Sequence, residues 1–426
     1  MSRRAFAAVT AGVTALSLAV AGPADARPAV AATGAWAAAP VAGQTLFGCP
    51  GGDGGLQDQT VRNIVYPSVG GSKVRVRLSN QFGTAPLVVP AASVGVVLSG
   101  ARLVPGSSHP LTFGGSKAVT VVPGSSVLSD WLDLPVQAHQ ELAVSVYVPQ
   151  LHGPATEHPS AQQDNFVSKT GDWSAAEDSG GYPATIPCWL FASGVDVQPE
   201  STVAGSVVGF GDSITDGANS AVNANDRWPD ELGRRLHERP GRTLSVVNEG
   251  IGGNQVLQDS GLSGVSALAR FDRDVLGQPG VRAVIVLEGV NDIGASDLGT
   301  RPHLAPDELI AAYRQLIARA HAAGVRVYGA TLLPFKGAFY WSEDGERTRA
   351  AVNDWIRHGG EFDGTADFAA AVANPADPQV YDPQYDSGDH LHPGDAGYRA
   401  MARAVDLSML VRGATGPRPT SASAGR

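Results

Sequence analysis

The hydrophobic pattern of the chain changes near residue 200, and this change most constrains the fold. From Trp36 to Pro199, short runs that alternate apolar and polar residues are separated by Gly, Pro, Ser and Asn. From Thr202 onward, compact apolar runs alternate with amphipathic segments. Strict alternation is typical of antiparallel strands with one buried face, whereas short unbroken apolar runs are typical of buried parallel strands. We therefore expect two domains of different class.

The first domain is predicted over residues 34–199 as an all-β sandwich or jelly roll. Residues 73–79 and 142–148 alternate strictly between apolar and other side chains. Pairs of Gly, or Pro followed by Gly, supply the turns between such runs. No segment of this stretch has the 3.6-residue period of a helix, which favours a purely antiparallel domain.

The second domain is predicted over residues 203–412 as a three-layer α/β domain with a parallel sheet. An amphipathic helix is predicted from Asp307 to Ala323, with Gly324 at the position that favours helix ends. Pro393 suits the first turn of a last helix. Such alternation of strands and helices indicates a parallel sheet covered by helices. The buried strands are predicted at residues 207–210, 244–247, 283–287 and 325–328.

The two ends of the chain are predicted to lie outside these domains. Residues 1–26 have the features of a signal peptide: Arg3 and Arg4, an apolar stretch, and a small-x-small cleavage motif at Ala24–Ala26. The paired arginines also resemble a twin-arginine export signal. An N-terminal membrane anchor is the weaker alternative because the apolar stretch is short and rich in small residues. We expect a secreted protein without a stable membrane anchor, and a disordered tail over residues 413–426.

Only two cysteines occur, Cys49 and Cys188. In an oxidising compartment we expect them to form a disulfide that fastens the two ends of the β-domain, worth about 4–5 kcal/mol at most. Two buried free thiols are the alternative. A pair of cysteines cannot form a four-cysteine zinc site, and the histidines lack metal-binding spacings, so no metal site is expected.

The charge of the chain argues against one class of partner. The sequence has 31 Lys and Arg against 41 Asp and Glu, which gives a net charge of -10. No stripe of basic residues interrupts this acidic balance, so nucleic acid is not an expected partner. The sequence assigns no oligomeric state.

The candidate catalytic residues follow the predicted strands or precede the last helix. In parallel sheets, ligands bind at the carboxyl ends of the strands, where Ser213, Gly253 and Asn291 are expected. Asp389 and His392 are three residues apart, so one segment could bring a base and its orienting carboxylate to Ser213. The amides of Ser213 and Gly253 and the carboxamide of Asn291 are candidate donors to an oxyanion. Acyl transfer by a serine nucleophile needs this set of groups.

These residues resemble the four signature blocks of the SGNH (GDSL) hydrolases, in that family's order. The blocks are Gly211-Asp212-Ser213, Gly253, Gly289-x-Asn291-Asp292 and Asp389-x-x-His392. The resemblance implies a flavodoxin-like α/β/α fold, a Ser213–His392–Asp389 triad, an oxyanion hole from Ser213, Gly253 and Asn291, and no cofactor. The segment 74–83 also resembles the N-terminal module of a secreted subgroup, some of whose members are associated with acetylated plant polysaccharides.

We therefore expect a secreted serine ester hydrolase that works through an acyl-enzyme. The favoured substrate is a short acyl ester, such as acetyl, on a carbohydrate. A lipid esterase or lysophospholipase with the same triad is the first alternative. A non-catalytic glycan-binding protein is the second, although every proposed catalytic position carries a competent residue. Aromatic residues near the predicted site, Trp228, Phe335, Tyr340 and Trp341, would either contact substrate or pack in the interior.

Overall fold

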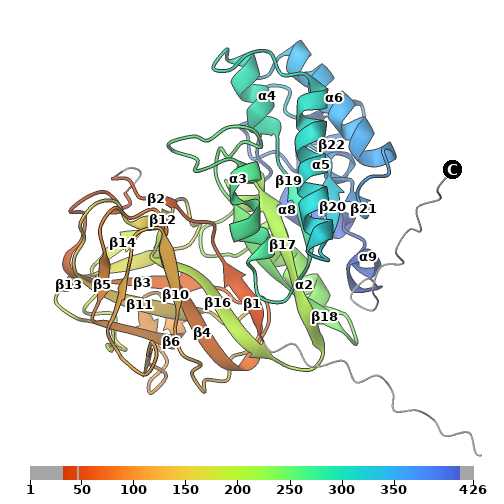
Figure 1. The fold of residues 1–426 in the computed structure, drawn as a ribbon. Coiled ribbons are helices and arrows are strands. Elements are labelled where there is room, and N and C mark those ends of the chain that lie inside the picture. Colours follow the sequence, from red (N-terminus) through yellow and green to blue (C-terminus); the bar gives the residue numbers. More distant parts are fainter. Residues whose placement is uncertain (1–31, 46–47, 413–426) are drawn as a thin grey trace, which may run out of the picture.

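The computed structural model describes residues 32–45 and 48–412. The predicted signal peptide and the predicted C-terminal tail lie outside these residues. Figure 1 shows an all-β part, coloured red to yellow-green, beside a part that contains all the labelled helices, coloured green to blue. The chain crosses between them once, between the strand that ends at Pro199 and the strand that begins at Val203.

The N-terminal part consists of antiparallel sheets, as the alternating pattern predicts. A four-stranded sheet has the order β1-β16-β4-β10, and a larger sheet has the order β14-β13-β3-β11-β6-β7, with β8 also pairing with β6. Smaller sheets have the orders β15-β12-β2 and β5-β9. The strands are β1 Thr33–Ala37, β2 Val41–Ala42, β3 Gln57–Val65, β4 Gly71–Asn80, β5 Leu87–Val89, β6 Ala91–Ser99, β7 Arg102–Leu103, β8 His109–Pro110, β9 Val119–Val121, β10 Ser125–Leu128, β11 Leu142–Gln150, β12 Thr156–His158, β13 Asn165–Thr170, β14 Ala184–Ile186, β15 Trp189–Leu190 and β16 Ala192–Pro199.

The apolar faces of these strands form one core. Val74, Val76 and Leu78 of β4 are fully buried, and so are Leu142 and Val144 of β11. All belong to a single cluster of buried side chains between the sheets. The period-two pattern therefore identified the buried face of β4 correctly, whereas β11 is buried on both faces, because Ala143 and Ser145 are fully buried as well.

The C-terminal part has a five-stranded parallel sheet of order β18-β17-β19-β20-β21. If these five strands are numbered 1 to 5 as they occur along the chain, their order across the sheet is 2-1-3-4-5. The direction in which successive strands are added to the sheet therefore reverses at β17. The strands are β17 Val203–Gly211, β18 Thr243–Gly250, β19 Val281–Leu287, β20 Arg326–Ala330 and β21 Gly364–Ala366; β22 Ala373–Asn374 and β23 Asp377–Tyr381 form a separate hairpin. The apolar runs predict four of the five strands. They do not predict β21, which has three residues with small side chains.

The helices fall into two groups according to their contacts. Helix α8 contacts both α2 and α7, and α3, α4, α5 and α6 form a second connected group. The predicted helix 307–323 is α5, and the predicted last helix is α8. The helices are α1 Ser213–Asp216, α2 Trp228–Glu238, α3 Ala267–Phe271, the π-helical turn η1 Asp272–Leu276, α4 Val290–Asp297, α5 Pro306–Ala322, α6 Glu343–His358, α7 Phe368–Val372, α8 Asp395–Ala404 and α9 Leu407–Arg412.

Backbone and side-chain hydrogen bonds join the two parts along β1 and β18. The Gly34 amide donates to the Pro279 carbonyl at 3.0 Å. The Ser245 hydroxyl donates to the Gly34 carbonyl at 2.7 Å, and the Val246 amide donates to the Ser68 hydroxyl at 2.9 Å. The two hydroxyl groups are buried, so these bonds form away from water and fix the relative position of the domains.

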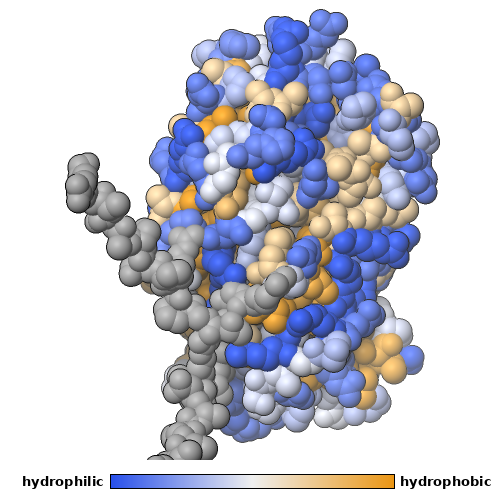
Figure 2. Space-filling model, turned by 90° about the vertical axis from the view of Figure 1, so that its right-hand side faces the viewer, coloured by the Kyte–Doolittle hydropathy of each residue, from blue (hydrophilic) through white to orange (hydrophobic). Residues whose placement is uncertain are grey.

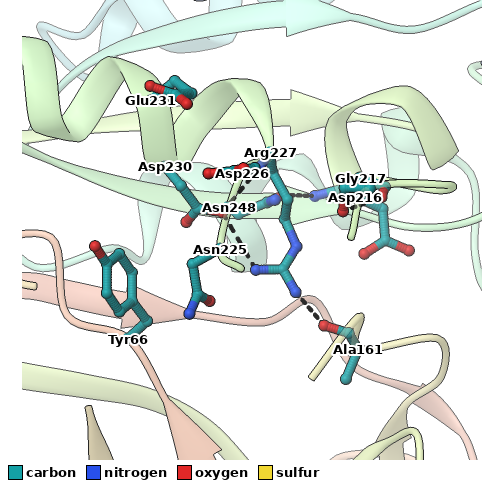
Figure 3. A network of polar contacts seen from close by, with 12 residues as sticks. Tyr66, Ala161, Asp216, Gly217, Asn225, Asp226, Arg227, Asp230, Glu231 and Asn248 are labelled. Carbon is teal, nitrogen blue, oxygen red and sulfur yellow. Dashed lines mark hydrogen bonds and ion pairs between the residues drawn. The ribbon is translucent and has the colours of Figure 1, made fainter. Parts of the chain in front are cut away.

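A second group of contacts joins the domains beside α1 and α2. Arg227 donates to the Ala161 carbonyl of the β-domain and lies 3.3 Å from the carboxylate of Asp230 (Figure 3). His158, which is buried, contacts Asp216 of α1 through Nε2 at 2.9 Å. The β-domain therefore reaches the helix that begins at Ser213.

Cys49 and Cys188 form a disulfide, with Cα atoms 5.9 Å apart and a sequence separation of 139 residues. The two residues belong to the buried core of the β-domain.

Hydrophilic residues cover much of the face drawn in Figure 2, with hydrophobic residues in patches between them. Among the described residues, no helix is both long and apolar enough to cross a membrane.

Candidate active site

Three neighbouring strands of the parallel sheet end at the candidate site. β17 leads into α1, whose first residue is Ser213, and Asp212 caps this turn by accepting from the Ile214 amide at 2.9 Å. β18 leads into the loop that contains Gly253, and β19 leads into the turn before Asn291. Since β18 and β19 flank β17, their carboxyl ends lie beside Ser213, at the point where the strand order reverses.

Ser213, His392 and Asp389 form a continuous chain of hydrogen bonds. Ser213 Oγ lies 2.8 Å from His392 Nε2, and His392 Nδ1 lies 2.6 Å from Asp389 Oδ2. With the proton on Nδ1, the imidazole donates to Asp389 and its Nε2 is free to accept the serine proton. The amide of His392 also donates to Asp389 Oδ1 at 2.8 Å, so the same carboxylate holds both the backbone and the ring of this residue.

Further donors, which the sequence analysis did not identify, hold Asp389. Asn219 Nδ2 donates to Asp389 Oδ2 at 2.9 Å, the Leu391 amide donates to Oδ1 at 2.9 Å, and the Ser387 hydroxyl lies 3.2 Å from Oδ1. Burial by itself would raise the pKa of Asp389, but the hydrogen bonds from His392 and Leu391 outweigh it and lower the pKa below its usual range. Asp389 is therefore a carboxylate at any pH at which the protein functions.

The loop after β18 is shaped to present backbone amides. Gly253 has φ +72, and a Cβ atom at this position would lie 2.4 Å from the Ser263 hydroxyl, so only glycine fits without a shift. Asn291 Nδ2 donates to the Asn254 carbonyl at 2.9 Å, which uses one of its two N–H groups. The second N–H group of Asn291 and the amide of Gly253 are the oxyanion donors that the sequence predicts.

Arg270 forms hydrogen bonds with three chain segments around the site. It is fully buried, and its Nε donates to the side chain of Asn254 at 2.9 Å. Its two terminal nitrogens donate to the carbonyls of Glu249 at 2.7 Å and Gly211 at 2.8 Å. Arg270 therefore fixes the end of β17, the end of β18 and the Gly253 loop relative to one another. No motif marks it, because a single arginine in a helical segment looks like a surface residue.

Buried acidic groups lie behind the nucleophile. Asp212 is almost fully buried, its Oδ2 has no hydrogen-bond partner, and burial raises its pKa to about 7. Burial likewise raises the pKa of Asp292 to about 6, although two backbone amides donate to it. Glu288 accepts no hydrogen bond, its Oε2 lies 3.5 Å from Arg270, and burial raises its pKa well above the usual range. Burial thus shifts the pKa of all three carboxyl groups upward, in contrast to the lowered pKa of Asp389.

Most of the aromatic residues singled out in the sequence pack in the interior. Trp228 and Phe335 are fully buried, and Tyr340 is 7% exposed, so the packing alternative is correct for these three. Phe339, which the sequence analysis did not consider, is 78% exposed and packs edge-on against Tyr340. Gly337 of the same loop lies against the ring of His390, two residues from His392.

One group of potential metal ligands occurs among the described residues, and it cannot act as such. It consists of Cys49, Cys188 and Glu157. Both sulfurs are bonded to each other and have no thiolate to offer. The triad residues use their polar atoms on one another and on neighbouring amides, in an arrangement suited to proton transfer.

Comparison with protein families places this site within a known class of domain. The model of the GDSL-like Lipase/Acylhydrolase family matches residues 210–400, which include Ser213, Gly253, Asn291, Asp389 and His392. No curated relative matches the chain.

Several solved structures are similar to the C-terminal part. An acetyl xylan esterase from Geobacillus stearothermophilus is 24% identical, with a TM-score of 0.38; the match covers 49% of this chain and 94% of the esterase chain. The aryl esterase of M. smegmatis is 19% identical, with 49% and 98% covered and a TM-score of 0.37. A GDSL-like lipase from Bacteroides thetaiotaomicron is 19% identical, with 50% and 91% covered and a TM-score of 0.37.

Proposed function

Because residues 210–400 belong to the GDSL-like lipase/acylhydrolase family and the protein is thus a carboxylic ester hydrolase, we propose that Ser213 is its nucleophile. The observation that carries this proposal is the 2.8 Å contact between Ser213 Oγ and His392 Nε2. A serine hydroxyl attacks an ester only when a base takes its proton, and a base at this distance can do so.

The reaction proceeds in two half-reactions. Ser213 Oγ attacks the ester carbonyl carbon while His392 takes the serine proton, and the tetrahedral oxyanion accepts hydrogen bonds from the amides of Ser213 and Gly253 and from Asn291. His392 then gives the proton to the leaving alcohol, and the acyl group remains on Ser213. A water molecule, deprotonated by His392, attacks the acyl-enzyme, the acid leaves, and Ser213 recovers its proton. Asp389 stabilises the imidazolium in both steps.

The direct test of this mechanism is hydrolysis of an aryl acetate by the purified protein and by Ser213→Ala. The wild-type protein should release the phenol with a burst if deacylation is slower than acylation. Substantial turnover by folded Ser213→Ala would exclude Ser213 as the nucleophile.

The proposed natural substrate is a short acyl group, such as acetyl, on a carbohydrate. The resemblance of segment 74–83 to a module of enzymes associated with acetylated polysaccharides supports this choice. The β-domain should contribute binding or support, because no chain of nucleophile, base and carboxylate occurs among its described residues. Release of acetate from an acetylated polysaccharide, measured beside release of fatty acid from a phospholipid, separates the carbohydrate substrate from the lipid alternative.

Phe339 favours a second candidate function, hydrolysis of lipid esters. A phenylalanine that is 78% exposed in the loop beside His390 could contact an acyl chain. If the protein acts on lipids, Phe339→Ser should lower kcat/KM more for long-chain than for acetyl esters. A non-catalytic glycan-binding role is disfavoured by the complete hydrogen-bond chain at Ser213.

We also propose that the protein is exported, with residues 1–26 as the signal peptide and residues 34–199 and 203–412 as the two domains of the mature chain. The basic n-region and the small-x-small motif support this proposal. N-terminal sequencing of protein collected from the medium should begin after Ala26. Retention of the intact N-terminus inside the cell would contradict it.

A further inference from the structure

We propose that a cavity between the two domains is a carbohydrate subsite that holds one sugar unit of the substrate. The cavity has a volume of about 220 Å³, and both domains contribute to its walls. Val41, Gln44, Glu157 and Pro159 come from the β-domain, and Asp216 and Leu262 come from the α/β domain. The inference rests on the proposed function, since it concerns the substrate of that reaction.

The cavity adjoins the catalytic groups. Gly252, which lines it, precedes Gly253 in the loop that presents the oxyanion donor. Ser263, which also lines it, has its hydroxyl where a Cβ atom of Gly253 would lie. Asp216 lies one turn after Ser213 in α1. The cavity therefore lies beside the Gly253 loop and the helix that begins at Ser213, and the inference is that a substrate bound at Ser213 extends into it.

Hydrogen-bond acceptors without a full set of partners face this space. Asp216 uses Oδ1 for His158, and within the described part of the chain its Oδ2 has no hydrogen-bond partner. Gln44 donates through Nε2 to the Gly261 carbonyl, which leaves its side-chain oxygen to accept. Hydroxyl groups of a sugar are the donors that such oxygens require.

A third acceptor, Glu157, lies in an unusual setting. Its Oε1 accepts from the Gln44 amide at 3.1 Å, and its Oε2 lies 2.9 Å from Cys49 Sγ. Because that sulfur belongs to a disulfide and has no hydrogen, Oε2 receives no proton from it. Oε2 is also packed against Gly51, where an added Cβ atom would collide with it, so a ligand could use only the remaining capacity of Oε1.

The charge of the walls favours a neutral ligand over a cation. Asp216 is paired with His158, whose pKa is raised by the carboxylate even though burial opposes this shift. Burial raises the pKa of Glu157 to about 7, so this carboxyl group carries only part of a charge near neutral pH. The two acidic side chains therefore supply acceptors with little net negative charge.

The size and the apolar walls favour a single ring. Pockets for drug-sized ligands have volumes of about 300–1,000 Å³, and this cavity is smaller. Val41, Pro159 and Leu262 offer apolar surface to the C–H face of a sugar ring. A long acyl chain would instead cover Asp216, Glu157 and Gln44 and deprive their oxygens of partners. An acetyl group alone would leave much of the volume unfilled.

The test compares two leucines that differ in their relation to the cavity. Leu262, which lines the cavity, is 59% exposed, and Leu298, which does not, is 53% exposed. Leu262→Trp should close the entrance with little effect on folding, because the side chain is largely in solvent. We expect kcat/KM for acetylated xylan to fall at least about tenfold more than kcat/KM for an aryl acetate, a difference of about 1.4 kcal/mol. Leu298→Trp should change neither value.

A binding measurement separates this inference from the proposed function. Calorimetric titration of an unesterified xylo-oligosaccharide into Ser213→Ala should show binding that Leu262→Trp and Gln44→Ala weaken and Leu298→Trp does not. Equal losses on both esters, or equal binding by the Leu262→Trp and Leu298→Trp proteins, would overturn the subsite. Failure of the wild-type protein to cleave any ester would instead overturn the proposed function.

Discussion

Asp389 and Asp212 both lie near Ser213, but their different surroundings shift their pKa values in opposite directions. Asp389, at the partly exposed end of the triad, accepts hydrogen bonds from His392, Leu391, Asn219 and Ser387, and its pKa is lowered. Asp212, in the buried layer behind the nucleophile, accepts one from Ile214, and its pKa is raised to about 7. Asp212 is almost fully buried and has one donor, whereas Asp389 is partly exposed and has several donors; both differences favour the ionised form more at Asp389.

The comparison assigns each aspartate a distinct contribution. A stable carboxylate at Asp389 can hold the His392 tautomer and stabilise the imidazolium. Because its pKa is raised to about 7, Asp212 carries only part of a negative charge near neutral pH while it caps the first turn of α1. A full negative charge behind the oxyanion would oppose catalysis.

The largest effect is expected for His392→Ala. Without the imidazole, Ser213 has no base within hydrogen-bond distance, and kcat should fall by roughly 10⁴–10⁶-fold. Steady-state hydrolysis of an aryl acetate measures the loss, and circular dichroism checks that the variant is folded. A decrease of less than tenfold would mean that another group deprotonates the serine.

Asp389→Asn should have the next largest effect. The amide would keep the shape but could not stabilise the imidazolium, and it would favour the wrong tautomer of His392. We expect kcat to fall by about 10³–10⁴-fold with KM little changed. If kcat stays within fivefold of the wild-type value, the lowered pKa of Asp389 has no catalytic meaning.

Asn291→Ala should lower kcat by about 10²–10³-fold, because it removes one donor to the oxyanion. It also removes the bond to the Asn254 carbonyl, as does Asn291→Asp, which keeps the shape but places a carboxylate where the oxyanion forms and should lower kcat further. Both variants should be impaired on an aryl acetate. A change confined to KM would reassign Asn291 to substrate binding.

Asp212→Asn should have the smallest effect on turnover, below about fivefold, since the amide resembles the neutral acid. Its clearer effect is on stability. An aspartate in the unfolded chain has a pKa of about 3.9, and in the folded protein Asp212 has a pKa of about 7. Between these values the folded state retains a proton that the unfolded state has released, so stability falls as the pH rises through this window.

Asp212→Asn removes this dependence. The free energy of unfolding of the variant minus that of the wild-type protein should therefore be more positive at pH 8 than at pH 5, because only the wild-type protein loses stability over this range. Urea unfolding at the two pH values measures the difference. An equal difference at both values would show that Asp212 is already ionised in the folded protein.

Sequence reasoning could predict the site residues that follow recognisable strands, but not those that reach the site through loop geometry or packing. Ser213, Gly253 and Asn291 follow long apolar runs, so their common position at the edge of the sheet could be inferred from the sequence alone. Asn219 and Arg270 could not be found in this way. Asn219 reaches Asp389 only through loop geometry, and the burial of Arg270 depends on packing that brings Phe210 and two backbone carbonyl groups around one guanidinium.

The fold shows a similar limit. Apolar runs predicted four strands of the parallel sheet, whereas β21, with the sequence Gly-Thr-Ala, gains its strand conformation from pairing with β20. The packing of the β-domain against α1 was also beyond the sequence, because His158 and Asp216 lie in segments that carry no motif. The short connection around Val197–Val203 favours close packing of the two domains but does not identify the surfaces that meet.

The central claim is that Ser213 is a nucleophile activated by His392, and covalent labelling tests it most directly. A phosphonate ester that reacts only with activated serines should add one equivalent to the wild-type protein, and peptide mass spectrometry should locate it on Ser213. Ser213→Ala should remain unlabelled, and His392→Ala should react far more slowly. Labelling of another serine, or equal labelling of wild-type and Ser213→Ala proteins, would contradict the account.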